Sequence, residues 1–159
     1  MYKPASLRNF LTTVNPELGR DPDRLLVFID DGQLLSTLAP GLSFEYAYTL
    51  HLVLTDYAGH PDAVMAPLLV WLRQHQPELL ANPDVRGKIT FEADLLANDK
   101  VDLSIRVPLT ERVGVHPRSG GDGFDLTHYQ EPVVDDGLAQ DGVPAIQELW
   151  LNGQRIAHW

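Results

Sequence analysis

The feature that most constrains this chain is an alternation of apolar and polar side chains over residues 42–55. The even positions are all apolar, namely Leu42, Phe44, Tyr46, Tyr48, Leu50, Leu52 and Leu54. A period of two residues over this length predicts a β-strand with one face on a core. At about 3.3 Å per residue the strand would span roughly 45 Å, which is longer than usual. We therefore expect its ends to bend, or to project beyond the domain toward a neighbour.

The odd positions of the same run predict a face that points away from the core. They are mostly polar or small, namely Ser43, Glu45, Ala47, Thr49, His51, Val53 and Thr55. Glu45, Thr49 and His51 are candidates for contact with a neighbouring molecule. Asp31, just upstream of the run, is a further candidate.

Shorter patterns on both sides of this strand predict an α+β fold. Helical spacing predicts helices over residues 4–14 and from about 61 to 76, where Pro67 suggests an opening turn before a main helix from about Ala66. Two apolar runs flank Asp31-Gly32, a favoured hairpin dipeptide, and residues 89–109 hold a second predicted hairpin. We expect a mixed or antiparallel sheet of about four to five strands packed against two helices.

The composition changes after Val115. Residues 116–144 are rich in Gly, Pro and Asp and lack periodic apolar side chains, so they predict an extended arm. An apolar run then returns at residues 146–151, followed by the turn dipeptide Asn152-Gly153 and a returning strand. The sequence therefore predicts that the arm ends in a β-hairpin.

These changes suggest how the chain is divided. We expect residues 1–115 to form an α/β domain and residues 116–159 to form an arm with a terminal hairpin, not an independent domain. An aromatic hairpin beyond an arm suits docking on a neighbouring surface. The candidate docking residues are Trp150, Arg155 and Trp159.

Composition excludes several classes of function. The chain has no cysteine, which removes disulfides and thiolate zinc sites. Its formal net charge is −10 and its basic residues are scattered, which disfavours a DNA-binding site. The same charge is compatible with a surface past which DNA slides without binding. The N-terminus lacks the apolar segment of a secretory signal, and no apolar run approaches the roughly 18 residues of a membrane span. We expect a chain that is made in the cytosol and has no membrane partner.

A search for reactive groups finds no phosphate-binding, dinucleotide-binding, zinc-protease or nucleophile-elbow motif. No two of the six histidines stand four residues apart. The Asp30-Asp31-Gly32 triplet predicts a turn, and Glu111-Arg112 predicts a solvated or interface ion pair. We predict no catalytic residue, no metal site and no cofactor. A calcium site in the arm is the alternative, on Asp122, Asp125, Asp135, Asp136 and Asp141, although their spacing does not match an EF-hand.

Several segments between Lys3 and Val113 resemble the tail completion protein R family of Peduovirus-like contractile-tailed phages. They are KPASLR, NPELGRDPDRLLVFIDDG, LSFEYAYTLHLVLTDYAGHPD, PLLVWLRQHQPELLANPD and ITFEADLLANDKVDLSIRVPLTERV. The order and spacing of the third and fourth segments are distinctive. The resemblance covers most of the predicted α/β domain and little of the arm.

The resemblance implies a structural virion protein, not an enzyme, at the head-proximal end of the tail. It implies a fold similar to tail terminators, which form hexameric rings on the last tube ring. The implied partners are further copies of the chain, tail tube and sheath proteins, and head-completion or neck proteins. The implied location is the host cytoplasm during assembly and then the neck of the virion tail. The alternatives are a neck adaptor layer above the terminator, a small metal-dependent enzyme, and a nucleic-acid-binding adaptor.

Overall fold

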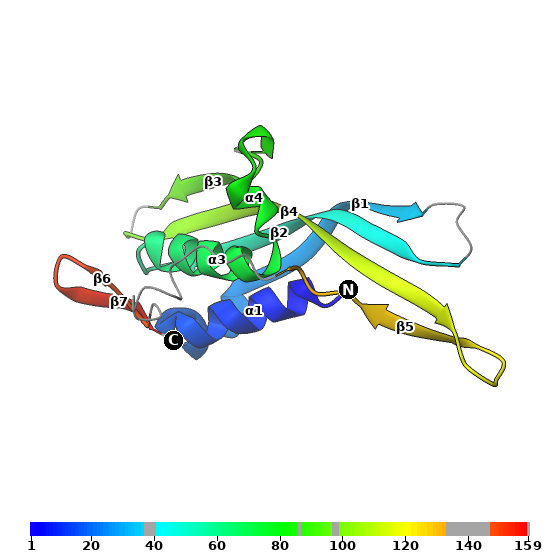
Figure 1. Ribbon diagram of the computed structural model, residues 1–159. Helices are drawn as coiled ribbons and strands as arrows, with labels where there is room; N and C mark the ends of the chain where they lie inside the picture. The colour runs from blue at the N-terminus through cyan, green and yellow to red at the C-terminus, as the bar shows by residue number, and fades with distance from the viewer. Residues whose placement is uncertain (37–40, 86, 97–98, 133–146, 159) are drawn as a thin grey trace, which may run out of the picture.

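The computed structural model describes residues 1–36, 41–85, 87–96, 99–132 and 147–158 (Figure 1). In chain order its elements are α1 (Lys3–Val14), α2 (Pro16–Arg20), η1 (Pro22–Arg24), β1 (Leu25–Ser36), β2 (Phe44–Tyr57), α3 (Asp62–His75), α4 (Glu78–Ala81), η2 (Pro83–Val85), β3 (Thr90–Leu95), β4 (Val101–Pro117), β5 (Phe124–His128), β6 (Glu148–Leu151) and β7 (Gln154–His158). The predicted α+β fold with a C-terminal β-hairpin is confirmed.

Five of these strands form one antiparallel sheet. Its order is β1-β2-β4-β3, and β5 pairs with the far end of β4. β2 and β4 pair from Phe44 opposite Val113 to Tyr57 opposite Val101. The edge of β4 that does not face β2 has two partners. β3 pairs with its first part, as far as Arg106, and β5 pairs with its last part, from Val113 onward. α1 and α3 lie on one face of the sheet, and the β1–β2 and β4–β5 hairpins extend past them (Figure 1).

The core lies between the sheet and the two longest helices. The even positions of β2 from Tyr48 to Leu54 are buried, and so are the odd positions of β4 from Val101 to Leu109. They form one cluster with helix residues that include Leu7, Leu11, Val64, Leu68, Trp71 and Leu72. Burying one such leucine contributes about 1.5–3 kcal/mol to folding. The alternation in the sequence therefore marks the strand that holds the domain together.

The Asp31-Gly32 dipeptide is a β-bulge and not the predicted hairpin turn. β1 continues through it, and its register against β2 passes from Asp30 opposite Thr49 to Gln33 opposite Ala47. This leaves one extra residue in β1, and Asp31 takes the left-handed φ of 50°. The turn prediction was wrong because a bulge and a tight turn need the same left-handed backbone, which Asp and Gly both tolerate.

α3 is one continuous helix that begins at Asp62, so the predicted main start at about Ala66 was wrong. Pro67 lies inside it and cannot donate a backbone hydrogen bond to the carbonyl of Ala63. The side-chain amide of Asn15 donates to that carbonyl at 3.1 Å instead. A side chain from the junction between α1 and α2 thus supplies the bond that the proline removes.

Asn15 also joins two other elements. It is buried, and its side-chain oxygen accepts from the backbone N–H of Glu17 at 3.0 Å and of Leu18 at 3.1 Å, which caps α2. Its amide donates a further hydrogen bond to the hydroxyl of Tyr57 at 2.7 Å. One side chain therefore connects α2, α3 and the end of β2.

We expect Asn15→Ala to lower the free energy of unfolding by about 3 kcal/mol, because a cap is lost and the buried Ala63 carbonyl keeps no donor. Chemical denaturation with urea measures this loss. Asn9→Ala on the exposed side of α1 is the matched control and should change stability by less than about 0.5 kcal/mol. An equal, small effect of both substitutions would contradict this role of Asn15.

β4 and β5 form a hairpin that the sequence did not predict. β5 lies within the segment expected to be an irregular arm, and it pairs with β4 from Val113 opposite His128 to Pro117 opposite Phe124. The proposed boundary at residue 115 therefore lies inside β4, a strand that serves both the body and the arm. Residues 133–146, the rest of the predicted arm, lie outside the described residues.

The terminal hairpin of β6 and β7 confirms the prediction from its turn dipeptide. Asn152 and Gly153 have φ values of 49° and 81°, the left-handed pair that a tight two-residue hairpin turn requires. β7 touches α2, and Ala157 is fully buried. Figure 1 shows this hairpin at the end of the molecule opposite to β5 and the outer parts of β1 and β2.

Candidate assembly surfaces

The sheet face opposite α1 and α3 carries the candidate residues of β2. Directly paired residues share a face, so Glu45 lies beside Arg112 of β4, and Thr49 lies between Asp30 of β1 and Pro108 of β4. Glu45 and Thr49 are both half-buried. The structure therefore brings these two candidates onto one mixed polar face.

His51 lies on the same face but is only 8% exposed. Its ring stacks at 4.8 Å from that of Phe28, and its Nε2 lies 3.4 Å from Oδ2 of Asp30. Asp31 lies next in the chain to that carboxylate, at the exposed bulge. His51 therefore helps to pack the outer face, whereas Asp31 is accessible to a partner.

The main polar feature inside the molecule is Glu111, which is 1% exposed and stands at an inward position of β4. Its carboxylate accepts hydrogen bonds from the backbone N–H of Tyr2 at 2.8 Å and of Lys3 at 3.3 Å. It also accepts from the hydroxyl of Tyr48 at 2.5 Å, and Nδ1 of His128 lies 3.9 Å away. A carboxylate at this place caps the positive end of α1 and joins it to the sheet.

The predicted solvated ion pair of Glu111 and Arg112 is therefore wrong for Glu111. Arg112 points to the other face, as the alternation of β4 requires, and its guanidinium lies 3.6 Å from the carboxylate of Glu131. The prediction failed because the alternation of β4 continues beyond Leu109, so that a charged residue takes the next inward position.

A second part of this network ties the arm to the helices. Lys3 is fully buried, and its ammonium donates to Oε1 of Gln76 at 2.6 Å and to Oε1 of Glu131 at 3.0 Å. Gln76 follows α3, and it also accepts from the backbone N–H of Thr110 at 3.1 Å. Its amide donates to the Thr110 hydroxyl at 3.0 Å. The Gln76 side chain thus occupies the edge of β4 between β3 and β5.

The pKa shifts near this network follow from packing. Burial is the main cause that raises the pKa of Tyr48 far above its usual 10, and the hydrogen bond to Glu111 adds to it. Burial also lowers the pKa of His75, and the neighbouring charge of Lys3 acts in the same direction. Tyr48 therefore stays a hydrogen-bond donor, and the neutral form of His75 is favoured.

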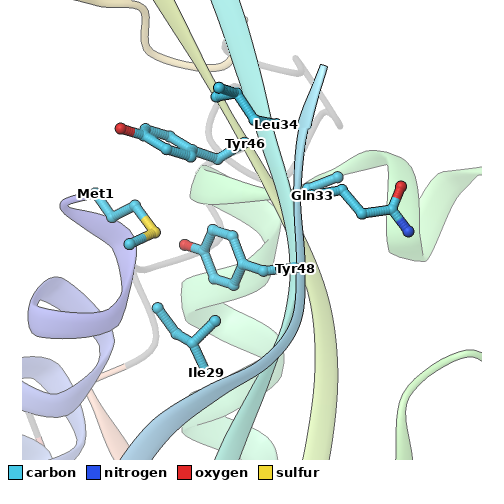
Figure 2. A pocket seen from close by; sticks show the side chains of 8 residues that line it. Met1, Ile29, Gln33, Leu34, Tyr46 and Tyr48 are labelled. Atoms are coloured by element: carbon cyan, nitrogen blue, oxygen red, sulfur yellow. The ribbon is translucent and has the colours of Figure 1, made fainter.

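An open hollow of about 240 Å³ lies on the helix side of the sheet, where the β1–β2 hairpin leaves the body. Figure 2 shows Met1, Ile29, Tyr46 and Tyr48 pointing into it, whereas Gln33 points away. Its lining is mostly apolar, and the Tyr48 hydroxyl is already bound to Glu111. The hollow is therefore a place for an apolar side chain rather than a site for acid–base chemistry.

The candidates at the C-terminus lie on the terminal hairpin. Trp150 is 59% exposed, and its indole N–H donates to Glu148 at 3.0 Å. Arg155 donates to the same carboxylate at 2.9 Å, and these bonds help to hold the pKa of Glu148 below its usual value. Trp159 lies outside the described residues. The described part of the hairpin therefore presents one exposed indole, that of Trp150.

The described residues contain no group of three or more His, Asp or Glu side chains that could hold a metal ion. Asp122 and Asp125 are exposed near the tip of the β4–β5 hairpin, where Asp125 lies 3.5 Å from Arg118. The other three acidic residues of the calcium alternative, Asp135, Asp136 and Asp141, lie outside the described residues. Among the helices in the described ranges, none has the length and apolar character to cross a membrane.

Most residues of the buried network that links α1, α3 and β4 carry no recognisable signal in the sequence. The sequence predicts no role for Lys3, Gln76 and Glu131, and it assigns Glu111 to an ion pair with Arg112 instead. Glu111 had a usable signal, because it continues the odd-numbered series of inward residues in β4. Lys3 and Glu131 had none, since their pairing depends on contacts between distant parts of the chain.

Comparison with known proteins gives the family. The profile described as "P2 phage tail completion protein R (GpR)" matches residues 1–132. Tail completion protein R of Escherichia phage P2 is 36% identical over 160 residues, which cover 100% of this chain and 99% of the relative. No solved structure matches the chain. The chain therefore belongs to the family of phage tail completion protein R.

Proposed function

We propose that this chain is a structural protein of the virion that completes a phage tail at its head-proximal end. The observation that carries the proposal is its end-to-end similarity to a tail completion protein of phage P2. In this role it caps polymerisation of the tail tube and prepares the tail for head joining. The chain acts by contact and not by catalysis.

We propose that six copies of the chain form a ring at the completed end of the tail. The β1–β2 and β4–β5 hairpins project from one end of the body and the β6–β7 hairpin lies at the other, which supports contacts to neighbours on two sides (Figure 1). The proposed partners besides further copies are tube and sheath proteins and head-completion or neck proteins. We place the chain in the host cytoplasm during assembly and then in the neck of the tail.

The outer sheet face, with Glu45 and Thr49, and the exposed Asp31 are the proposed contacts with a neighbour or with the lumen of the ring. The net charge of −10 supports a lumen that repels the phosphates of passing DNA. Trp150 and Arg155 of the terminal hairpin are the proposed contacts with an adjacent layer. In this proposal residues 1–115 form the body of the protein, and residues 116–159 form an arm that contacts neighbouring molecules.

Electron microscopy of particles assembled without the protein tests this function. We expect tails of irregular length without heads, and restoration of both defects when the chain is supplied. Tails of uniform length that lack only heads would favour the alternative of an adaptor layer above the terminator. Tails of normal length with full head attachment would contradict both roles.

A further inference from the structure

Five large apolar side chains are exposed where the β1–β2 and β4–β5 hairpins extend past the helices. They are Met1, Leu34, Leu42, Phe124 and Leu126, each between 50% and 65% exposed, and we call them the arm patch. Single exposed apolar residues are ordinary, but a group of this size on a projecting part marks a surface that a partner covers.

Strand pairing places three residues of the arm patch, Leu34, Phe124 and Leu126, on the helix side of the sheet. Leu126 lies opposite the buried Val115, and Phe124 lies opposite the exposed Pro117, both at odd positions of β4 like its buried residues. Leu34 lies opposite Tyr46, which points into the hollow of Figure 2. These three residues of the arm patch therefore continue the core face of the sheet beyond the cover of α1.

The area of the arm patch suits a stable interface. If a large apolar side chain offers on the order of 200 Å², the exposed fractions of these five correspond to roughly 600 Å². Each partner in an interface of standard size gives up about 600–1,000 Å². The apolar part of the patch alone reaches the lower end of this range.

A second apolar group lies on β3 and the residue after it. Phe91, Leu95 and Leu96 are 62%, 88% and 37% exposed, and we call them the edge patch. Phe91 and Leu95 lie opposite Ile105 and Val101 of β4, so they too belong to the helix-side face of the sheet. β3 is an edge strand without a register shift, which leaves its outer backbone groups open to a partner.

The two patches lie at opposite ends of the sheet, since β3 lies at one end and β5 and the outer parts of β1 and β2 lie at the other in Figure 1. We propose that the arm patch of one copy packs on the edge patch of the next copy. Such a head-to-tail contact uses two different surfaces of one chain, and it closes into a ring when the rotation between copies allows it. This inference rests on the proposed ring and names the surfaces that build it.

Cysteine crosslinking tests the contact cleanly, because the chain has no cysteine of its own. Chains with Leu126→Cys and chains with Phe91→Cys are co-expressed with different tags and treated with a short bismaleimide. We expect crosslinked dimers that contain both tags, and at least tenfold fewer dimers from either variant alone. Efficient crosslinking of Leu126→Cys to itself would mean a two-fold contact and would overturn the proposal.

A charge in the arm patch gives the second measurement. We expect the double variant Leu34→Asp and Leu126→Asp to stay folded, because both side chains are exposed, and to lose the oligomer in light scattering. Asn9→Asp on α1 is the control and should keep it. An oligomer that survives the double variant overturns this contact but leaves the ring, and the arm patch then belongs to another tail protein. A wild-type chain that is monomeric in solution and within tails overturns the ring itself.

Discussion

A chain with Tyr48→Asp is expected to be unfolded. Tyr48 is 4% exposed, and its hydroxyl donates to the buried carboxylate of Glu111. Aspartate would replace this donor with a second negative charge and remove the aromatic ring from the core. An unpaired buried charge costs about 3–5 kcal/mol and the lost ring a similar amount, which together approach the entire stability of an ordinary domain. Circular dichroism and size-exclusion chromatography of the purified variant measure the loss of fold.

Glu45→Lys is the matched control on the same strand. Glu45 lies on the opposite face, is half-buried, and has Arg112 beside it on β4. We expect a change in stability within about 1 kcal/mol, because a charge reversal on a half-exposed face beside Arg112 is screened by solvent. Assembly of tails should suffer more than folding. Equal loss of folding in both variants would show that the two faces of β2 are not distinct in burial.

Glu111→Ala is expected to cost about 3–5 kcal/mol, because the removed carboxylate leaves three donors without an acceptor. These are the Tyr48 hydroxyl and the backbone N–H groups of Tyr2 and Lys3. The start of α1 would lose its anionic cap and its link to β4. Urea denaturation gives the loss, and hydrogen exchange of the first turn of α1 locates it.

Glu111→Gln separates charge from shape at this position. The amide keeps one acceptor oxygen and the volume of the side chain, so we expect a loss of about 1–2 kcal/mol. If the alanine variant were as stable as the glutamine variant, the carboxylate would not anchor α1, and the network would be an incidental contact.

Much of the fold follows from periodicity alone. The alternation of β2 predicts a strand with Leu50, Leu52 and Leu54 buried, and all three are fully buried. The terminal hairpin follows from Asn152 and Gly153, whose left-handed conformations few other dipeptides supply so readily. Local backbone preference and the pattern of burial agree at these places, so the sequence suffices.

Prediction from the sequence fails where a local pattern fits two different backbone structures, or where contacts between distant residues determine the structure. Asp31-Gly32 fits both a hairpin turn and a bulge, and only the pairing of both halves of β1 with β2 selects the bulge. Pro67 reads as a helix break until Asn15 satisfies the Ala63 carbonyl. β5 is short and exposed, so it carries no burial pattern, and its pairing with β4 depends on the hairpin as a whole.

The position of the Gln76 side chain makes the length of the β4–β5 hairpin independent of the core. It fills the edge of β4 between β3 and β5 and so separates the hydrogen-bond ladder of the body from that of the β4–β5 hairpin. Adding or removing paired residues at the hairpin tip would then lengthen or shorten the arm without shifting any residue of the core. In the ring that we propose, the length of this hairpin would set the span between adjacent copies, so a longer or shorter hairpin would change the diameter of the ring and leave the body unaltered.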